Sequence, residues 1–497
     1  MMKEKYILSI DAGTTSSRSI IFDRKGKQVA ISQYEFQQIF PNKSWVEHDP
    51  EEIWNTQLKS IREVLKKSNI NPTNIDSIGI TNQRETTVIW DKNTGKPIYN
   101  AIVWQDRRTA KYCESLIKDN NSFCVKTFFY KKTGLILDAY FSATKIKWIL
   151  DNVSEAKDKA SNGEILFGTI DSWLIWKLTN GKHHITDATN ASRTLLYNIH
   201  ELKWDSDLLK FLKIPKEILP KVVESSQIIG STNILGEKIK ISGIAGDQQA
   251  ALFGQLCLNP GDVKNTYGTG CFCIMNTGEI PIESNNKMLT TIAYQLNGKT
   301  TYAIEGSIFI AGALIQWLRD NLEIIEKASD IENLAKTVKD NGGVTFIPTL
   351  SGVAAPYWDP YATGSIIGIT RDTRKGNIAR AALEGIALRC REVIMAMEED
   401  SNTNFSELKV DGGASNNNLL MQIQSDLLRS KVIRPKTTET TALGVAFLAG
   451  LATGFFKDLN EIEKIWEEDV SFIPNNSNYT KDLINLWKKR IKLSLSK

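Results

Sequence analysis

Two parts of the sequence repeat one short pattern, and this repeat constrains the fold more than any other feature. Residues 7–11 are apolar, a turn rich in glycine and hydroxyl residues follows (DAGTTSSR, 11–18), and the chain is apolar again up to residue 22. The same order recurs at 263–275 around the turn YGTG. Each copy predicts a strand, a glycine turn and a returning strand. We therefore expect an internally duplicated chain in which a hairpin begins each half.

The remaining segments alternate between strand-like and helix-like patterns. Apolar runs predict strands at 29–34, 75–80, 86–90, 288–294, 301–304 and 408–410, and helical spacing predicts helices at 50–65, 307–320, 376–398, 417–428 and 439–451. Such alternation indicates a layered α/β fold. A chain of 497 residues exceeds the size at which one hydrophobic core keeps growing. We therefore predict two domains, residues 1–253 and 254–497.

The composition is that of an ordinary globular enzyme and argues against several other classes. The 61 Lys and Arg and the 57 Asp and Glu are spread along the chain, so a nucleic-acid partner is not expected. The six cysteines include no Cys-x-x-Cys pair, which favours a reducing, cytoplasmic location over a disulfide framework or a zinc ribbon. The first residues contain no long apolar segment of the kind that a secretion signal needs, so secretion is not expected, and the most apolar stretch, 308–318, is too short to span a membrane.

The glycine turns carry groups that suit a phosphate chain. Glycine lets backbone N–H groups approach an anion closely, and hydroxyl side chains donate hydrogen bonds without adding charge. The first turn supplies Thr14, Thr15 and Arg18, and Asp11 at its start is suited to hold a water of a magnesium ion. A tight hairpin without function is the alternative for any one turn. Because YGTG and a third turn, DGGAS at 411–415, repeat the chemistry, we favour phosphate binding.

Two common nucleotide-binding motifs are missing from the sequence. The candidate for a P-loop, Gly298-Lys299-Thr300, has Ala293 where the Walker pattern requires its first glycine. No turn fits Gly-x-Gly-x-x-Gly at the start of a helix after a strand, so a dinucleotide cofactor is not expected.

A charged pair follows the strand predicted at 75–80. Arg84 and Glu85 lie in the segment TNQRETT, at a strand end of the kind where α/β sheets place ligands. A polyol hydroxyl both donates and accepts hydrogen bonds, so an adjacent cation and carboxylate suit it. A surface salt bridge is the alternative for this pair, and Trp104 and Tyr140 are core aromatics by default.

Asp247 is the candidate for a catalytic base. It follows Gly246 at the start of a helical pattern, in the segment IAGDQQAAL (244–252). A carboxylate there can accept the proton of an attacking hydroxyl during phosphoryl transfer. It can equally cap the N-terminus of the helix, which is an ordinary role for aspartate.

Motifs along nearly the whole chain resemble those of the glycerol kinases, which belong to the FGGY carbohydrate kinase family and share the actin-like ATPase fold. The matching segments are DAGTTSSR (11–18), TNQRETT (81–87), YFSATKIKW (140–148), GDQQ (246–249), NTYGTGCF (265–272), GSIIGI (364–369) and DGG (411–413). The resemblance implies two ribonuclease H-like ATPase domains with the active site in the cleft between them.

The resemblance implies a reaction and the residues that serve it. The acceptor would be glycerol, ATP and Mg2+ would be required, and sn-glycerol 3-phosphate and ADP would be the products. Glycerol would be held by Arg84, Glu85, Tyr140, Asp247 and Gln248 against a wall of Trp104 and Phe272, with Asp247 as the base. ATP would be bound by Thr14, Thr15, Ser16, Arg18, Thr269, Gly312, Gln316, Gly413 and Asn417, with magnesium near Asp11 through a water. Family members form dimers and tetramers, so a homodimer or homotetramer is expected.

Two other functions stay open at the level of sequence. A kinase of the same fold could act on a pentulose or another sugar, although Trp104 and Phe272 would stand where a larger sugar needs room. A non-catalytic actin-like ATPase would use its nucleotide cycle to control partner binding. Such a protein would need neither the Arg84–Glu85 pair nor a base at Asp247.

Overall fold

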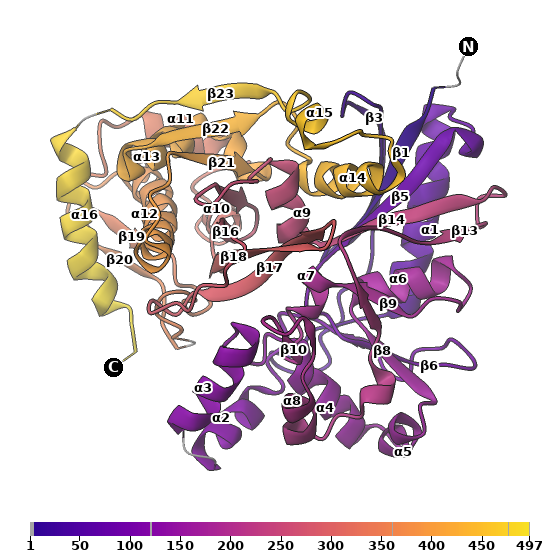
Figure 1. Cartoon of the computed structure of the whole chain (residues 1–497). Coiled ribbons are helices and arrows are strands. Elements are labelled where there is room, and N and C mark those ends of the chain that lie inside the picture. The colour runs from indigo at the N-terminus through magenta and orange to yellow at the C-terminus, as the bar shows by residue number, and fades with distance from the viewer. Residues whose placement is uncertain (1–3, 120–121, 360, 476, 497) are drawn as a thin grey trace.

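The computed structural model describes residues 4–119, 122–359, 361–475 and 477–496, and its framework is two mixed sheets (Figure 1). The first contains, in spatial order, β13 (Ser226–Thr232), β14 (Ile239–Gly246), β5 (Ile75–Asn82), β1 (Tyr6–Ala12), β2 (Ser16–Phe22) and β3 (Gln28–Glu35). The second contains β17 (Leu289–Leu296), β18 (Lys299–Ile308), β16 (Cys271–Gly278), β15 (Val263–Tyr267), β21 (Glu407–Asp411), β22 (Lys431–Pro435) and β23 (Glu468–Phe472).

The two sheets share one strand order. In the first, β1 pairs antiparallel with β2 and parallel with β5, and β5 pairs parallel with β14. In the second, β15 pairs antiparallel with β16 and parallel with β21, and β21 pairs parallel with β22. A third antiparallel strand, β3 or β18, extends each hairpin. The duplication predicted from the repeated pattern is therefore present, and the first two glycine turns join the strands of the two hairpins.

Helix α1 (Pro50–Ser68) shows why the predicted helices form. Asp49 accepts a hydrogen bond from Glu51 N at 2.8 Å, and Pro50 fits the first helical position, where no N–H donor is needed. Acidic residues in the first turn and lysines in the last turn complement the helix dipole. The buried face of α1 packs on β2 and β3. In the second half α12 (Lys375–Ser401) packs on β16 and β18 in the same way.

Helices α9 (Asp247–Gly254) and α14 (Thr440–Thr453) cross where the two halves meet. A side chain at Gly254 would lie 2.0 Å from the Thr440 carbonyl oxygen, and one at Gly444 would lie 1.8 Å from the Ala250 carbonyl oxygen. Glycine is therefore required at both positions for the backbones to approach this closely. Helix α14 also packs on β1, β5 and β14, as Figure 1 shows. A segment late in the sequence thus covers the first sheet.

Helices α2 (Ala110–Asp119), α3 (Ser122–Thr133), α4 (Ser142–Asn152), α5 (Ala156–Ser161) and α8 (Ser206–Leu212) form a further lobe of the first half, below the first sheet in Figure 1. Helix α6 (Ile170–Leu178) instead packs on the first sheet and on α1, and its Trp173, Leu174 and Ile175 belong to the core of that sheet. A core that includes Phe129, Phe141 and Phe167 holds much of the lobe together. In this part of the chain, the sequence patterns identified candidate site residues only at Trp104 and in the motif 140–148, which begins with Tyr140.

Two predicted elements begin later than expected. The helix predicted at 307–320 begins at Gly312 as α10 (Gly312–Asp320), because Ser307 and Ile308 still pair with β16 as the end of β18. The strand predicted at 86–90 is β6 (Val88–Asp91), which starts after the chain has turned through Arg84 and Glu85.

Among the described helices, none is long and apolar enough to cross a membrane. The six cysteines are free thiols.

Candidate active site

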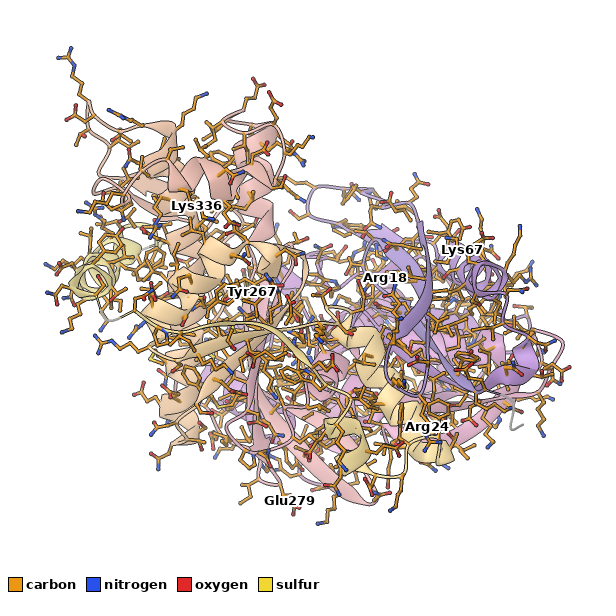
Figure 2. All side chains as sticks on the ribbon, turned by 90° about the horizontal axis from the view of Figure 1, so that it is seen from above. Arg18, Arg24, Lys67, Tyr267, Glu279 and Lys336 are labelled. Atoms are coloured by element: carbon orange, nitrogen blue, oxygen red, sulfur yellow. The ribbon has the colours of Figure 1, made fainter. Side chains whose placement is uncertain are left out.

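The first glycine turn brings two charged groups, Asp11 and Arg18, beside Glu439 from the second half. Asp11 is buried, and its Oδ2 accepts a hydrogen bond from Arg18 Nη2 across the hairpin. Arg18 Nη1 donates to Oε2 of Glu439, the residue before α14, at 2.8 Å. In the view from above, Arg18 lies toward the middle of the molecule and the labelled Tyr267 of the second turn lies across from it (Figure 2). Arg18 is therefore held between two carboxylates at the junction of the halves.

The hydroxyl groups of this turn retain protons to donate. Thr15 is exposed at the tip, and Thr14 is half-buried with its Oγ1 accepting from Trp104 Nε1 at 3.0 Å. Ser16 is buried, and its Oγ accepts from Gln33 Nε2 at 2.9 Å. In both contacts the hydroxyl is the acceptor, so its own hydrogen can turn toward an anion.

The second and third turns lie against each other. A side chain at Gly412 would lie 2.6 Å from the Tyr267 carbonyl oxygen, and Gly412 has a φ of +84°, so this position requires glycine. Thr269 is exposed at the tip of the second turn. At the start of α10, Gly312 N donates to the Gly268 carbonyl oxygen at 3.0 Å. The structure thus brings together three segments that were predicted to contact ATP.

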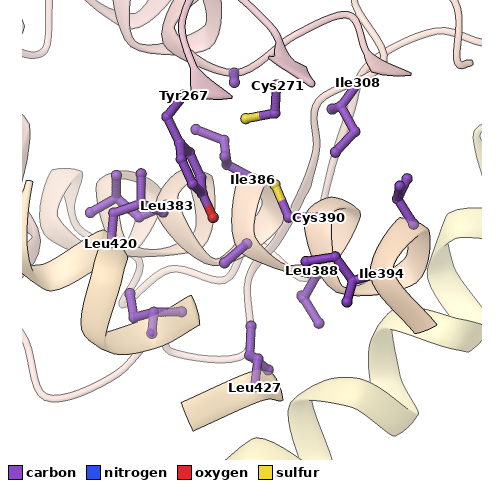
Figure 3. Close-up of a cluster of buried hydrophobic side chains, with 14 of the residues drawn as sticks. Tyr267, Cys271, Ile308, Leu383, Ile386, Leu388, Cys390, Ile394, Leu420 and Leu427 are labelled. Atoms are coloured by element: carbon purple, nitrogen blue, oxygen red, sulfur yellow. The ribbon is translucent and has the colours of Figure 1, made fainter. Parts of the chain in front are cut away.

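Tyr267 anchors the second turn in the core of the second half. Its ring points from the strand toward α12 and lies near Cys271 and Cys390 (Figure 3). Its hydroxyl donates to Gln424 Oε1 at 2.7 Å. The tyrosine of the YGTG motif therefore fixes the turn, whereas Thr269 is the side chain that remains at the surface of the site.

Besides Gly312, three residues were predicted to lie toward the nucleoside, and they differ in exposure and in hydrogen bonding. Gln316 is exposed on α10, one turn after Gly312, and Gly413 is exposed directly after Gly412. Asn417 caps α13 (Asn418–Leu428), with its Oδ1 accepting from the N–H of Leu420 at 2.9 Å. All three border the second and third turns, which is compatible with one nucleotide site.

Arg84 and Glu85 lie immediately past β5 and are buried, so the surface salt bridge considered from the sequence is wrong. Arg84 Nε lies 3.2 Å from Asp247 Oδ1. Glu85 has a φ of +61°, a left-handed conformation that a glutamate rarely adopts, and Ser142 Oγ donates to its carbonyl oxygen at 3.0 Å. Backbone strain of this kind concentrates at functional sites.

The three predicted aromatic residues meet across the two halves. The Trp104 ring packs edge to face with Tyr140, at 5.7 Å between centroids, and with Phe272, at 6.2 Å. Tyr140 is buried, whereas Trp104 and Phe272 are half-buried. Phe272 comes from β16 of the second sheet and the other two from the lobe of the first half. An apolar wall is thus completed only when both halves are in place.

Asp247 is the first residue of α9, and Gly246 occupies the capping position, so the cap interpretation is wrong. The Asp247 carboxylate accepts from Gln248 N at 2.7 Å, and about 30% of its side chain is exposed. Burial raises the pKa of Asp247 to about 6, and the neighbouring Arg84 guanidinium opposes this rise. At neutral pH the carboxylate is therefore ionised and basic enough to accept a proton from a hydroxyl.

Several residues of the site were missed by the sequence patterns. Gln248 Oε1 accepts from the buried ammonium of Lys264, which also donates to Thr266 Oγ1 at 2.8 Å. Glu305 and Arg193 form buried ion pairs behind Arg84 and Glu85, and Glu439 pairs with Arg18. Glu305 directly follows a predicted strand and Lys264 lies beside a glycine turn, but no local pattern assigns either of them a partner.

Magnesium has one predicted contact in this site, the carboxylate of Asp11. Within the described residues there is no group of three or more His, Cys, Asp and Glu that could hold a metal ion. A single buried carboxylate beside the phosphate turns fits Mg2+, which keeps several waters and is held largely by the phosphates of a nucleotide.

The chain is similar to curated proteins over almost its whole length. The model for the FGGY family of carbohydrate kinases, N-terminal domain, matches residues 6–254, and the model for the C-terminal domain of that family matches residues 263–453. A glycerol kinase from Petrotoga mobilis is 57% identical over 98% of both chains. Glycerol kinase 2 from Thermotoga maritima is 56% identical over 99% of both chains.

Solved structures share the fold. The crystal structure of Plasmodium falciparum glycerol kinase with ADP has a TM-score of 0.92 at 36% identity and covers 99% of both chains. A ligand-bound xylulose kinase from Lactobacillus acidophilus has a TM-score of 0.86 at 24% identity, covers 99% of this chain and 97% of its own, and bears on the fold alone. The predicted two-domain, actin-like architecture is confirmed. The chain belongs to the FGGY family of carbohydrate kinases.

Proposed function

We propose that this chain transfers the γ-phosphoryl group of ATP to glycerol, forming sn-glycerol 3-phosphate and ADP in glycerol catabolism. The observation that carries the proposal is the group around Asp247, a carboxylate with a pKa of about 6 beside a buried arginine–glutamate pair and an aromatic wall. The relatives named glycerol kinase and the related glycerol kinase structure with ADP support the choice of acceptor and nucleotide.

The acceptor end of the site has groups for each part of glycerol. Arg84 offers N–H donors and Glu85 an acceptor, because Oε2 of Glu85 receives no hydrogen bond from the described residues. Trp104 and Phe272 cover the carbon chain, and Tyr140 and Gln248 complete the enclosure. Asp247 takes the proton of the reacting hydroxyl while that oxygen attacks the γ-phosphorus.

The donor end holds ATP through the three turns. In the proposal the phosphates contact Thr14, Thr15, Ser16 and Arg18, Thr269 lies between them, and the nucleoside side is formed by Gly312, Gln316, Gly413 and Asn417. Bound Mg2+ would neutralise charge on the phosphates, with Asp11 holding it through a water. Arg18 is released from Asp11 when phosphate oxygens offer it a stronger anionic partner.

The test of the base is the Asp247→Asn variant. The amide keeps the shape of the side chain but cannot accept the proton, so kcat should fall by roughly 100- to 10,000-fold while ATP binding persists. Initial rates and nucleotide titration measure the two quantities. Asp207→Asn, an exposed position of the first half, is the control and should leave kcat unchanged. Turnover of Asp247→Asn close to that of the wild type would contradict the proposal.

A coupled ADP-release assay across glycerol, dihydroxyacetone, xylulose and ribulose separates the other functions. Trp104 and Phe272 pack edge to face and would stand where a larger sugar needs room, which favours a three-carbon acceptor. Faster turnover of a pentulose than of glycerol would move the assignment to a sugar kinase of the same fold. ADP release that no acceptor stimulates would favour a non-catalytic ATPase.

The proposal includes the organisation of the molecule. We keep the division into residues 1–253 and 254–497, which the two family-model matches support. Resemblance to the family favours a homodimer or homotetramer, and the free cysteines are compatible with the cytoplasm. Size-exclusion chromatography with light scattering would measure the oligomeric state.

A further inference from the structure

Glu305 of the second half reaches into the acceptor site of the first half. It lies on β18 and is fully buried. Its carboxylate accepts from Arg84 Nη1 at 2.5 Å, from Arg84 Nη2 at 3.0 Å and from Arg193 Nη2 at 3.0 Å. The two hydrogen bonds to Arg84 are bidentate, and this geometry fixes the plane of the guanidinium.

Arg193 extends the contact to the second member of the polyol pair. It is fully buried, and its Nε donates to Glu85 Oε1 at 2.6 Å. Glu305 therefore holds Arg84 directly and Glu85 through Arg193. Burial raises the pKa of Glu305, but the charges of Arg193 and Arg84 outweigh it and lower this pKa to about 2, so the carboxylate is ionised at any pH at which the enzyme would work.

The hydrogen bonds that Arg84 makes to Glu305 and Gln249 determine which of its N–H donors remain for a substrate. An arginine has five N–H donors. Arg84 Nη1 donates one hydrogen to Glu305 and the other to Gln249 Oε1 at 3.1 Å, and Nη2 donates one of its two hydrogens to Glu305. The remaining donors are one hydrogen on Nη2 and that on Nε, which lies 3.2 Å from the Asp247 carboxylate. Glu305 thus determines which edge of Arg84 faces the proposed base, Asp247.

We propose that Glu305 is a positioning residue for the polyol. Through Arg84 and Arg193 it orients the Arg84–Glu85 pair, and it makes polyol binding depend on the docking of the second half. The inference rests on the proposed function, because it takes Arg84 and Glu85 as the residues that hold glycerol. Glu305 itself need not contact the substrate.

The primary test is Glu305→Gln, which keeps the length and shape of the side chain but removes the anion shared by two guanidinium groups. The glycerol KM should rise roughly tenfold or more, and the ATP KM should stay within about twofold of the wild type. Glu384→Gln is the matched control. Glu384 is equally buried and ion-paired, with Arg380 Nε at 2.8 Å, but it lies outside the site. This control should lose thermal stability without a change in the glycerol KM.

A double variant distinguishes the loss of polyol positioning from the loss of protein stability. Arg193→Met combined with Glu305→Gln removes one charge of each sign, so the thermal stability lost in the single variant should be partly recovered. The glycerol KM should remain high, because Arg84 and Glu85 are still without their support. Recovery of the glycerol KM together with stability would show that Glu305 has only a structural role and would overturn the inference.

The remaining outcomes distinguish the inference from the function on which it rests. If the wild type phosphorylates another polyol instead of glycerol, the same KM comparison is made with that polyol. A wild type that phosphorylates no polyol overturns both the proposed function and the inference. An active wild type whose Glu305→Gln variant has an unchanged acceptor KM, or equal rises in both KM values, overturns the inference alone.

Discussion

Asp247 is buried enough to be a better base than a free aspartate and open enough to meet a substrate. Its pKa of about 6 lies between that of an ordinary carboxyl and the pH of a neutral solution. A carboxylate with a lower pKa would accept a proton less readily, and one with a higher pKa would be protonated at pH 7. Burial and the nearby Arg84 act in opposite directions, and their balance sets this value.

The pH dependence of the reaction follows from this value. Because the acid form of Asp247 cannot accept a proton, kcat/KM for glycerol should fall as the pH drops below about 6, by about tenfold per pH unit. Initial rates between pH 5 and 8 at saturating ATP measure the profile. Samples held at pH 5 and assayed again at pH 7.5 should recover full activity, which excludes unfolding as the cause. A flat profile down to pH 5 would contradict the assignment of the base.

Trp104 of the proposed acceptor site is linked by one hydrogen bond to Thr14 of the proposed phosphate turn. Trp104→Phe should keep the aromatic wall but remove the Nε1 hydrogen that is donated to Thr14 Oγ1 at 3.0 Å. Loss of one such bond costs about 1 kcal/mol, so the ATP KM should rise several-fold, with a smaller change in the glycerol KM. Steady-state kinetics measure both. Trp204→Phe, which loses a bond to the Pro220 carbonyl oxygen away from the site, is the control. A change confined to the glycerol KM would speak against the predicted role of Thr14.

Among the secondary-structure elements, the crossing of α9 and α14 is the contact most sensitive to volume. Gly444→Ala would place a methyl carbon 1.8 Å from the Ala250 carbonyl oxygen, so the helices would have to separate. We expect a loss of roughly 3 kcal/mol or more in the free energy of unfolding, measured by chemical denaturation. Thr441→Ala adds no atom on the same helix and should change stability little. A Gly444→Ala protein as stable as the wild type would show that the crossing can relax.

The elements that could be predicted from sequence are those whose patterns are local. The hairpins around DAGTTSSR and YGTG, and helix α1 with its cap at Asp49, are specified by residues close together in the chain. The start of α10 was predicted five residues early because the ladder with β16 holds residues 307 and 308 as strand. That competition is between distant segments, and no window of local sequence contains it.

The residues of the candidate site also fall into two groups: those that local sequence indicates and those that only the fold brings together. Asp247 and Arg84 follow strand ends, and the glycine turns join strands; at such positions local sequence indicates groups that can meet a ligand. Glu305 and Arg193 are 112 residues apart, and each is indistinguishable from an ordinary structural residue until the fold brings them to 3.0 Å. Sequence therefore reveals the groups that face a substrate more readily than the groups that hold them in place.

In the whole molecule, the proposed acceptor site is built from both halves. Phe272, Lys264 and Glu305 come from the second sheet, whereas Arg84 and Trp104 come from the first half. Helix α14 belongs to the end of the chain but covers the first sheet. Any movement of one half against the other therefore changes the aromatic wall and the ion pairs of Glu305 at the same time. Substrate binding and domain position should be coupled.

Small-angle X-ray scattering tests this coupling. Glycerol together with a non-hydrolysable ATP analogue should reduce the radius of gyration more than either ligand alone, because closure over both substrates excludes water that would otherwise hydrolyse ATP. The Glu305→Gln protein should need a higher glycerol concentration for the same change, because its Arg84–Glu85 pair is no longer held from the second half. Scattering that is identical with and without both ligands would mean that the halves are already fixed, and that the ion pairs of Glu305 position the site without any motion.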